Sequence, residues 1–163
     1  MRLRVSVDTR EKVPLEFKRF DVEIVREALK LGDYGAATLT NGEQLAMIPV
    51  FFQRKGLPDL FGTLTNEKRH SLLRDQCLMA IEVRAKLILA IEGTDEDVLN
   101  GFAYSDVPGT TVMKAITTMW FRYDLIPMLC ASRDVMEWRM MNIWKTWERL
   151  SAGNRPQGSQ DHP

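Results

Sequence analysis

The apolar run at residues 87–91, Leu-Ile-Leu-Ala-Ile, constrains the fold of this chain more than any other segment. It has the length of a strand, and a strand that is apolar at every position needs cover on both faces of its sheet. The nearby residues 67–84 and 112–123 carry apolar side chains at helical spacing. This alternation predicts an α/β fold, a mixed sheet flanked by helices.

The N-terminal part of the chain has mainly strand character. Apolar residues alternate with polar ones in residues 3–7 and end at Asp8, which predicts a first strand. Asn41-Gly42 is a strong hairpin signal, so a tight turn is expected there. Further extended segments are expected at residues 22–25, from the turn at 32–35 through Leu39, and at 45–52.

The middle of the chain is expected to form helices around the central strand. Pro58 suits the first turn of a short helix through Leu64. Asn66 suits the N-cap of a longer helix from residue 67 to about residue 84. Residues 94–110 are acidic and contain glycine and proline, so they are expected to form a loop with one helical turn.

The C-terminal part is expected to end in a strand and a helix. Residues 125–130 read as a strand near a sheet edge, because Pro127 cannot donate to a ladder hydrogen bond. Ser132 is expected to cap the last helix. We therefore expect one domain over residues 1–150 and a disordered tail over residues 151–163.

Composition excludes several classes of protein. The hydrophobic content of 45% is too high for a disordered chain. No apolar run approaches the roughly 20 residues that a membrane helix needs, and the alternating start does not resemble a signal peptide. The two cysteines, Cys77 and Cys130, are too few for a disulfide scaffold and are expected to be reduced core residues. These features favour an intracellular, cytoplasmic protein without a membrane partner.

Charge is balanced overall but distributed unevenly along the chain. The formal net charge is zero. Residues 91–106 carry five acids and no bases, whereas residues 51–75 carry five bases against three acids. A neutral protein with this distribution can still present one basic face to a polyanion.

Four residues on or beside the expected strands suggest phosphodiester chemistry. They are Asp8, Asp33, Gln53 and Lys55. A nuclease that uses Mg²⁺ has to hold the ion with oxygen ligands and neutralise a phosphate. A lysine two residues after a ligand on a strand points to the same face, where it can contact the phosphate. By itself this spacing is common, and surface turns and a solvated strand end would explain it equally well.

A longer set of motifs resembles the nuclease domain of the XPF family. That family carries Gly-Asp, a variable spacer, Glu-Arg-Lys and then Asp after three further residues. Here the corresponding residues are Gly32-Asp33, Gln53-Arg54-Lys55 and Asp59. Residues 7–11, the strand that ends in Glu-Gly at position 93, and residues 115–150 resemble further parts of the family in the same order.

The resemblance implies a restriction-endonuclease-like fold and Mg²⁺- or Mn²⁺-dependent cleavage of DNA at junctions, flaps or duplex ends. It implies a metal site at Asp8, Asp33 and Gln53, and a catalytic group of Asp33, Gln53 and Lys55. Glu11 and Asp59 would support the motif. The residues expected to contact DNA are Arg10, Arg54, Lys68, Arg69 and Arg74.

Gln53 departs from the family pattern, which has glutamate at this position. A glutamine carbonyl can still bind a hard cation, but it brings no charge and accepts no proton. The chain could therefore be an endonuclease with reduced or abolished activity, or a catalytically inactive DNA-binding or scaffold subunit. A third reading is a glutamine introduced to trap a substrate complex. The sequence does not separate these alternatives.

The last helix carries more apolar side chains than one small domain can bury. Trp138, Trp144 and Trp147 lie on it together with Met141. We therefore expect a homodimer built mainly from the last two helices, as the family resemblance also implies.

Overall fold

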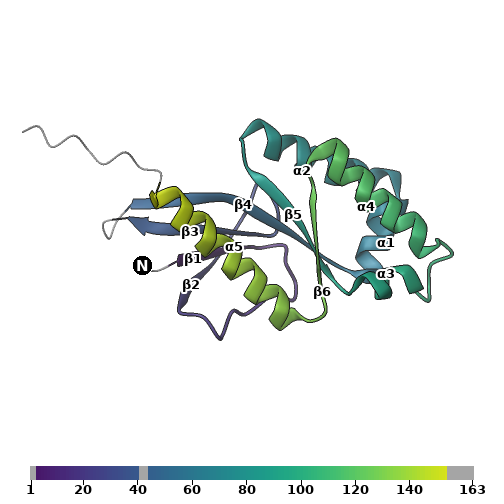
Figure 1. Cartoon of the computed structure of the whole chain (residues 1–163), viewed down its shortest axis with the longest axis horizontal. Helices are drawn as coiled ribbons and strands as arrows, with labels where there is room; N and C mark the ends of the chain where they lie inside the picture. Colours follow the sequence, from purple (N-terminus) through teal and green to yellow (C-terminus); the bar gives the residue numbers. More distant parts are fainter. Residues whose placement is uncertain (1–2, 41–43, 154–163) are drawn as a thin grey trace, which may run out of the picture.

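A computed structural model describes residues 3–40 and 44–153 of the chain (Figure 1). It contains a mixed sheet of six strands in the order β2-β1-β3-β4-β5-β6. The strands β1 and β2 are parallel, β3 is antiparallel to both β1 and β4, and β4, β5 and β6 are parallel. The strands are β1 (Leu3–Asp8), β2 (Val22–Glu27), β3 (Tyr34–Thr40), β4 (Gln44–Gly56), β5 (Lys86–Glu92) and β6 (Ile126–Cys130).

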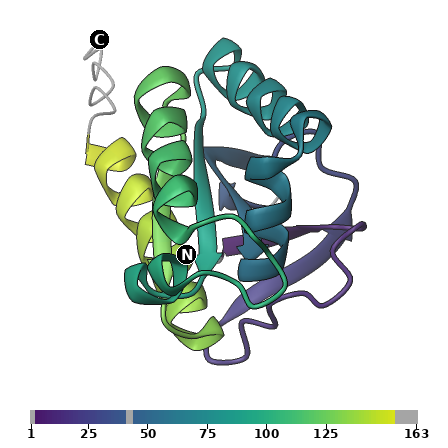
Figure 2. The ribbon, with the colours of Figure 1, turned by 90° about the vertical axis from the view of Figure 1, so that its right-hand side faces the viewer.

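Five helices cover this sheet in two groups. In Figure 1 α5 lies across β1 and β3, whereas α1, α2, α3 and α4 lie together on the right-hand side, and Figure 2 shows that group from its outer side. The two groups enclose two separate apolar cores. The helices are α1 (Leu57–Thr65), α2 (Glu67–Glu82), α3 (Asp95–Asn100), α4 (Gly109–Tyr123) and α5 (Arg133–Gly153). The predicted α/β fold is confirmed.

The central strand β5 divides its side chains between the two cores. Leu87, Leu89 and Ile91 pack in the core beneath α1, α2 and α4. Ile88 and Ala90 pack in the core beneath α5. All five are buried, as expected for an apolar strand that is covered on both faces.

Local signals in the sequence set most of the element ends. The Asn66 side chain accepts a hydrogen bond from the Arg69 backbone and caps α2. The Ser132 hydroxyl accepts one from Val135 at the start of α5. Pro127 lies in β6, which is the edge strand at that end of the sheet. The acidic segment forms α3, a short helix that begins with a capping box between Thr94 and Asp97.

The end of the last helix differs from the expectation, and parts of two expected segments lie outside the described residues. The last helix is longer than expected, because α5 continues through Gly153 and takes up residues 151–153 of the predicted tail. The rest of that tail, and the Asn41-Gly42 turn, lie outside the described residues. Both cysteines are free and buried, as predicted. No helix in the part of the chain that the structure describes is long and apolar enough to cross a membrane.

A bulge interrupts the pairing of β4 with β3 but leaves the alternation of β4 side chains unchanged, because Ile48, Val50 and Phe52 all pack in the core beneath α5. The pairs Ala36–Ile48 and Tyr34–Phe52 are separated by one residue on β3 and by three residues on β4. Pro49 lies inside this interval, where its missing N–H leaves no ladder bond unmade. Beyond the bulge β4 pairs in parallel with β5 through Gly56. Its even-numbered residues then face α5, and its odd-numbered residues face α1 and α2.

Candidate active site

A cavity of about 350 Å³ opens between the end of β4 and the helices α1 and α2. Five of the residues singled out from the sequence line it, so the fold brings together side chains from four separate segments. Gln76 on α2, which the sequence had not placed in the site, lies there too. The full lining is Arg10, Asp33, Gln53, Lys55, Thr63, Arg69, Leu72, Leu73 and Gln76.

The turn that presents Asp33 fits tightly against β4. Gly32 has a positive φ of 68°, which favours glycine. A Cβ atom at this position would lie 2.8 Å from the carbonyl oxygen of Phe52. Next to it, the Asp33 backbone N–H donates to that same Phe52 oxygen at 2.7 Å, and the Asp33 carbonyl accepts from Asp8 at 2.8 Å. The backbone of Asp33 is therefore fixed between β1 and β4.

The Asp33 carboxylate is bound by the chain itself. Its Oδ2 atom accepts one hydrogen bond from the Gln53 side-chain amide at 2.5 Å and another from the Arg54 backbone at 2.8 Å. Burial raises the pKa of Asp33 to about 6, against the opposing effect of the Arg54 backbone hydrogen bond. Asp33 is thus an acid whose ionisation is costly where it stands.

Asp59 holds two of the cavity's cations. Its Oδ2 atom lies 3.0 Å from the Lys55 ammonium, and its Oδ1 atom lies 3.2 Å from the Arg69 guanidinium. Gly62 leaves space for this guanidinium, since a Cβ atom there would lie 2.6 Å from Arg69 Nη1. Lys55 is mostly buried, whereas Arg69 is half-exposed. The motif residue Asp59, on α1, therefore positions two of the cations at the cavity.

Asp8 is buried beside the cavity, with its carboxylate turned to Arg10. It accepts hydrogen bonds from the Arg10 side chain at 2.7 and 3.0 Å and from the Leu29 backbone at 2.8 Å. The Arg10 hydrogen bond outweighs burial and lowers the pKa of Asp8 to about 2. Arg10 in turn lines the cavity. Asp8 reaches the cavity through Arg10, and its predicted role as a metal ligand stays a prediction.

Arg54 lies on the opposite face of β4 from Gln53 and Lys55. Its guanidinium pairs with Glu11 at 2.8 Å and with Glu92 at 2.6 Å, and its side chain is only 13% exposed. Strand alternation places it there, although the sequence grouped it with the DNA-contacting bases because it is their neighbour in the chain. Arg54 and Glu11 thus form part of a buried ion-pair network on the α5 side of the sheet.

The other predicted bases lie on α2. Lys68 is exposed near the start of the helix. Arg74 is partly buried and donates to the Ser71 hydroxyl at 3.0 Å. With Arg69, they give α2 a basic N-terminal part next to the cavity.

Gln76 connects α2 to the turn that carries Asp33. Its side-chain oxygen accepts from the Gly32 backbone at 3.0 Å, and its side-chain nitrogen donates to the Lys30 carbonyl at 3.3 Å. The sequence carried a signal for the side of α2 on which Gln76 lies, though not for its contact with the turn. Gln76 follows Arg69 by seven residues, which is two helical turns and therefore the same side of α2.

The residues present make an incomplete set of ligands for Mg²⁺. Asp33 supplies one carboxylate, while the Gln53 side chain turns its nitrogen towards Asp33. Within residues 3–40 and 44–153, no three acidic, histidine or cysteine side chains lie close enough together to hold a metal ion. Mg²⁺ is usually held by one or two carboxylates together with substrate phosphates. Among the residues that line the cavity, Asp33 is the one carboxylate that could bind such an ion.

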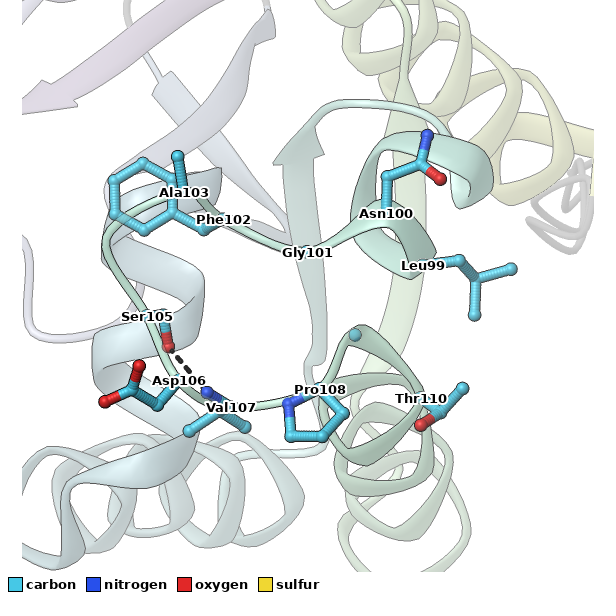
Figure 3. Close-up of a pocket in the computed structure, with 11 residues that line it drawn as sticks. Leu99, Asn100, Gly101, Phe102, Ala103, Ser105, Asp106, Val107, Pro108 and Thr110 are labelled. Atoms are coloured by element: carbon cyan, nitrogen blue, oxygen red, sulfur yellow. Dashed lines mark hydrogen bonds between the residues drawn. The ribbon is translucent and has the colours of Figure 1, made fainter.

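A larger cavity, of about 420 Å³, lies away from these residues in the loop between α3 and α4. Most of the side chains drawn in Figure 3 point away from its centre. Asp106 is the one titratable residue of its lining. The smaller cavity, by contrast, gathers one carboxylate and three cations.

Comparisons with known proteins agree on the fold. Residues 7–137 match the ERCC4 domain. Among solved structures, XPF from Aeropyrum pernix is similar with a TM-score of 0.63 at 18% identity, covering 93% of this chain and 66% of that protein. XPF from Aeropyrum pernix in complex with DNA is similar with a TM-score of 0.58 at 19% identity, covering 96% and 68%. A comparison with curated protein sequences found no match.

Proposed function

This chain belongs to the ERCC4 domain family, and on that premise we propose that it is a DNA endonuclease domain acting on branched or duplex DNA inside the cell. The observation that carries the proposal is the cavity that unites Asp33, Gln53 and Lys55 with Arg10 and Arg69. These residues come from distant parts of the chain, so their convergence is a property of the fold. The DNA complex of the similar XPF structure supports nucleic acid as the ligand.

The cavity offers a phosphate group cations at two depths. Lys55 lies within it and can stabilise negative charge that develops on a phosphate under attack. Arg69 and Arg10 are more exposed and can hold phosphates of the DNA backbone. Recognition of this kind reads the shape and charge of DNA and not its bases, which suits a junction, a flap or a duplex end.

We further propose that cleavage depends on Mg²⁺ or Mn²⁺ and is slow in this chain because of Gln53. A divalent ion would supply Lewis-acid polarisation of the phosphate. The loss of one carboxylate about 4 Å from one metal charge forfeits roughly 1–4 kcal/mol in a partly wet site. Gln53 also cannot accept a proton. The chain should therefore bind DNA more effectively than it cuts it.

The test is a nicking assay across flap, fork, four-way junction and linear duplex substrates. Gln53→Glu should raise Mg²⁺- or Mn²⁺-dependent cleavage at least tenfold, which corresponds to about 1.4 kcal/mol of barrier. Asp33→Ala in the Gln53→Glu chain should remove the gain, which also excludes a contaminating nuclease. A Gln53→Glu chain that binds metal but stays inert on every substrate contradicts the endonuclease proposal.

A second candidate is a catalytically inactive DNA-binding or scaffold subunit, with which the hydrogen bond from Gln53 to Asp33 is compatible. In such a subunit the amide would replace the metal as the partner of Asp33 and keep the fold intact. The same assay separates the two candidates. The scaffold predicts DNA binding by both chains and cleavage by neither.

We also propose a homodimer through the outer sides of α4 and α5. Trp138 and Trp147 on α5 are 59% and 39% exposed, and Trp120 and Phe121 on α4 are 47% and 82% exposed. The apolar excess of α5 is smaller than its sequence suggests, because Met141 and Trp144 are buried within the chain. A stable interface through these side chains would bury at least about 1,000 Å².

A further inference from the structure

We propose that Gln76 is a positioning residue that fixes the turn before Asp33 and so places the Asp33 carboxylate at the cavity. This inference rests on the proposed function, because it assigns a role to Gln76 in the site that would act on DNA. Its starting point is that a side chain on α2 contacts the backbone of a turn 44 residues earlier in the chain.

The first step is that Gln76 satisfies backbone groups of this turn. Gly32 is buried, and its N–H donates to the Gln76 side-chain oxygen at 3.0 Å. The Gln76 side-chain nitrogen donates to the Lys30 carbonyl at 3.3 Å. Without these contacts a buried N–H would lose its partner, and such a group is costly to leave unpaired. An amide side chain accepts at its oxygen and donates from its nitrogen at the same time, as the contacts with Gly32 and Lys30 require.

The second step is that the turn has little freedom on its other side. The left-handed φ of Gly32 and its close approach to Phe52 fix the turn against β4. On the other side, Gln76 on α2 holds the turn through its two hydrogen bonds. The backbone before Asp33 is therefore held between a strand and a helix, and Asp33 is the next residue along.

The third step is that the helix side carrying Gln76 also carries Arg69. Both residues line the cavity, and Arg69 is tied to α1 through Asp59. The helix α2 thus helps to position both the Arg69 guanidinium and, through Gln76, the Asp33 carboxylate. A shift of α2 relative to the Asp33 turn would change the distance between them, and Gln76 opposes that shift.

The first measurement is amide hydrogen exchange by NMR in the unmodified chain and in two variants. In Gln76→Met, both hydrogen bonds are lost, so the Gly32 and Asp33 amides should exchange at least about tenfold faster. In Gln76→Glu, the oxygen that accepts from Gly32 remains, so Gly32 protection should stay within about threefold of the original. Leu78→Met, a change without charge at an exposed neighbour on α2, should leave both amides unchanged.

The second measurement separates positioning from DNA binding. In the Gln53→Glu background, Gln76→Met should lower kcat about tenfold while the Kd for DNA changes by less than about twofold. Leu78→Met should change neither quantity. A merely structural role for Gln76 would instead lower DNA affinity and thermal stability together without a selective loss of kcat.

The outcomes distinguish the two proposals. If Gln53→Glu cuts no DNA, the proposed function fails, and amide exchange alone decides the role of Gln76. Faster exchange of Gly32 and Asp33 in Gln76→Met, with Gly32 protection kept in Gln76→Glu, supports the positioning role. Unchanged exchange in Gln76→Met, or an unaltered kcat in an active Gln53→Glu chain, overturns it.

Discussion

The side-chain nitrogen of Gln53 donates a hydrogen bond to a carboxylate oxygen of Asp33 across 2.5 Å. A glutamate at position 53 would have no proton to donate at neutral pH, so the same place would hold two facing carboxylates. Such a pair needs a cation or a shared proton to be stable. The glutamine therefore removes the requirement for a cation at this point of the chain.

Gln53→Glu should destabilise the metal-free chain. The change exchanges a hydrogen bond for a like-charge contact, so the free energy of unfolding at pH 7.5 should fall by roughly 1–3 kcal/mol. Mg²⁺ at millimolar concentration should recover most of this loss in Gln53→Glu and should have little effect on the original chain. Urea denaturation with EDTA and with Mg²⁺ measures both effects.

The matched control is Gln53→Met, which has similar size and no charge. It should lose about 1 kcal/mol by losing the hydrogen bond, and Mg²⁺ should restore none of it. If the Gln53→Glu chain is as stable as the original chain without metal, the two carboxylates do not face each other as the structure implies.

The pKa of Asp33 predicts that the chain loses stability as pH rises from about 4 to about 6. In this range the unfolded chain has released the Asp33 proton, whereas the folded chain still holds it. The folded state binds more protons, so the free energy of unfolding decreases with pH. With allowance for partial exposure, the decrease should be about 2 kcal/mol.

Asp33→Asn tests this dependence directly. Asparagine keeps an oxygen for the Gln53 and Arg54 donors and has no charge to bury, so the variant should be more stable than the original chain at pH 7.5. Its stability should also lose the Asp33 contribution to the slope between pH 4 and pH 6. Parallel curves for the two chains would show that Asp33 ionises normally.

Asp8→Asn should have the opposite effect on stability. The Asp8 pKa is lowered to about 2 by Arg10, so its contribution is complete above about pH 4 and is lost as pH falls towards 2. Asparagine forfeits that contribution, which should cost about 2 kcal/mol at neutral pH. Urea denaturation at pH 7 measures the cost, and a change below about 0.5 kcal/mol would contradict a stabilising contact between the buried Asp8 carboxylate and Arg10.

Arg69 and Arg54 should separate DNA binding from folding. Arg69→Ala removes a half-exposed cation at the cavity, so affinity should fall about equally for unrelated DNA sequences, and the salt dependence should weaken by about one phosphate contact. Arg54→Met removes the cation that pairs with Glu11 and one of the two cations beside Glu92, so it should lower the free energy of unfolding by roughly 3 kcal/mol.

Fluorescence anisotropy over a range of salt concentrations, together with urea denaturation of each variant, makes the comparison. At a temperature where both variants are folded, Arg54→Met should bind DNA like the original chain. Normal DNA affinity in Arg69→Ala, or an affinity that does not change with salt concentration, would contradict DNA binding by the basic N-terminal part of α2.

The proposed homodimer predicts a mass near twice 18.8 kDa by light scattering at micromolar concentration. Trp138→Glu places a charge in the expected interface and should produce the monomer. Ile24→Glu changes an exposed residue on the edge strand β2 and should leave the dimer intact. A monomer of the original chain, with and without DNA, rules the dimer out.

The sequence was sufficient for the fold because its local signals agreed with one another. The apolar alternation before Asp8, the Asn66 cap and the edge position of Pro127 all have local causes, and all were correct. The expected convergence of Asp33, Gln53 and Lys55 also followed from strand alternation.

Other features of the site depend on contacts that no local pattern encodes. Arg54 was expected beside the DNA, but its orientation depends on Glu11 and Glu92, which lie far from it in the chain. Met141 and Trp144 were counted as surplus, although the chain had a second core to receive them. The contact of Gln76 with the Asp33 turn required knowing how α2 lies against a distant loop.

The faces to which Gln53, Arg54 and Lys55 point depend on whether the number of residues in the bulge around Pro49 is odd or even. Between Ile48 and Phe52 the chain adds residues on β4 that β3 does not match, and everything after them takes its direction from that number. If a single residue were removed there and the alternation of β4 continued through the deletion, Gln53 and Lys55 would turn towards α5 and Arg54 towards α2. An odd insertion or deletion would thus exchange the reactive face with the ion-pair face, and an even one would restore it.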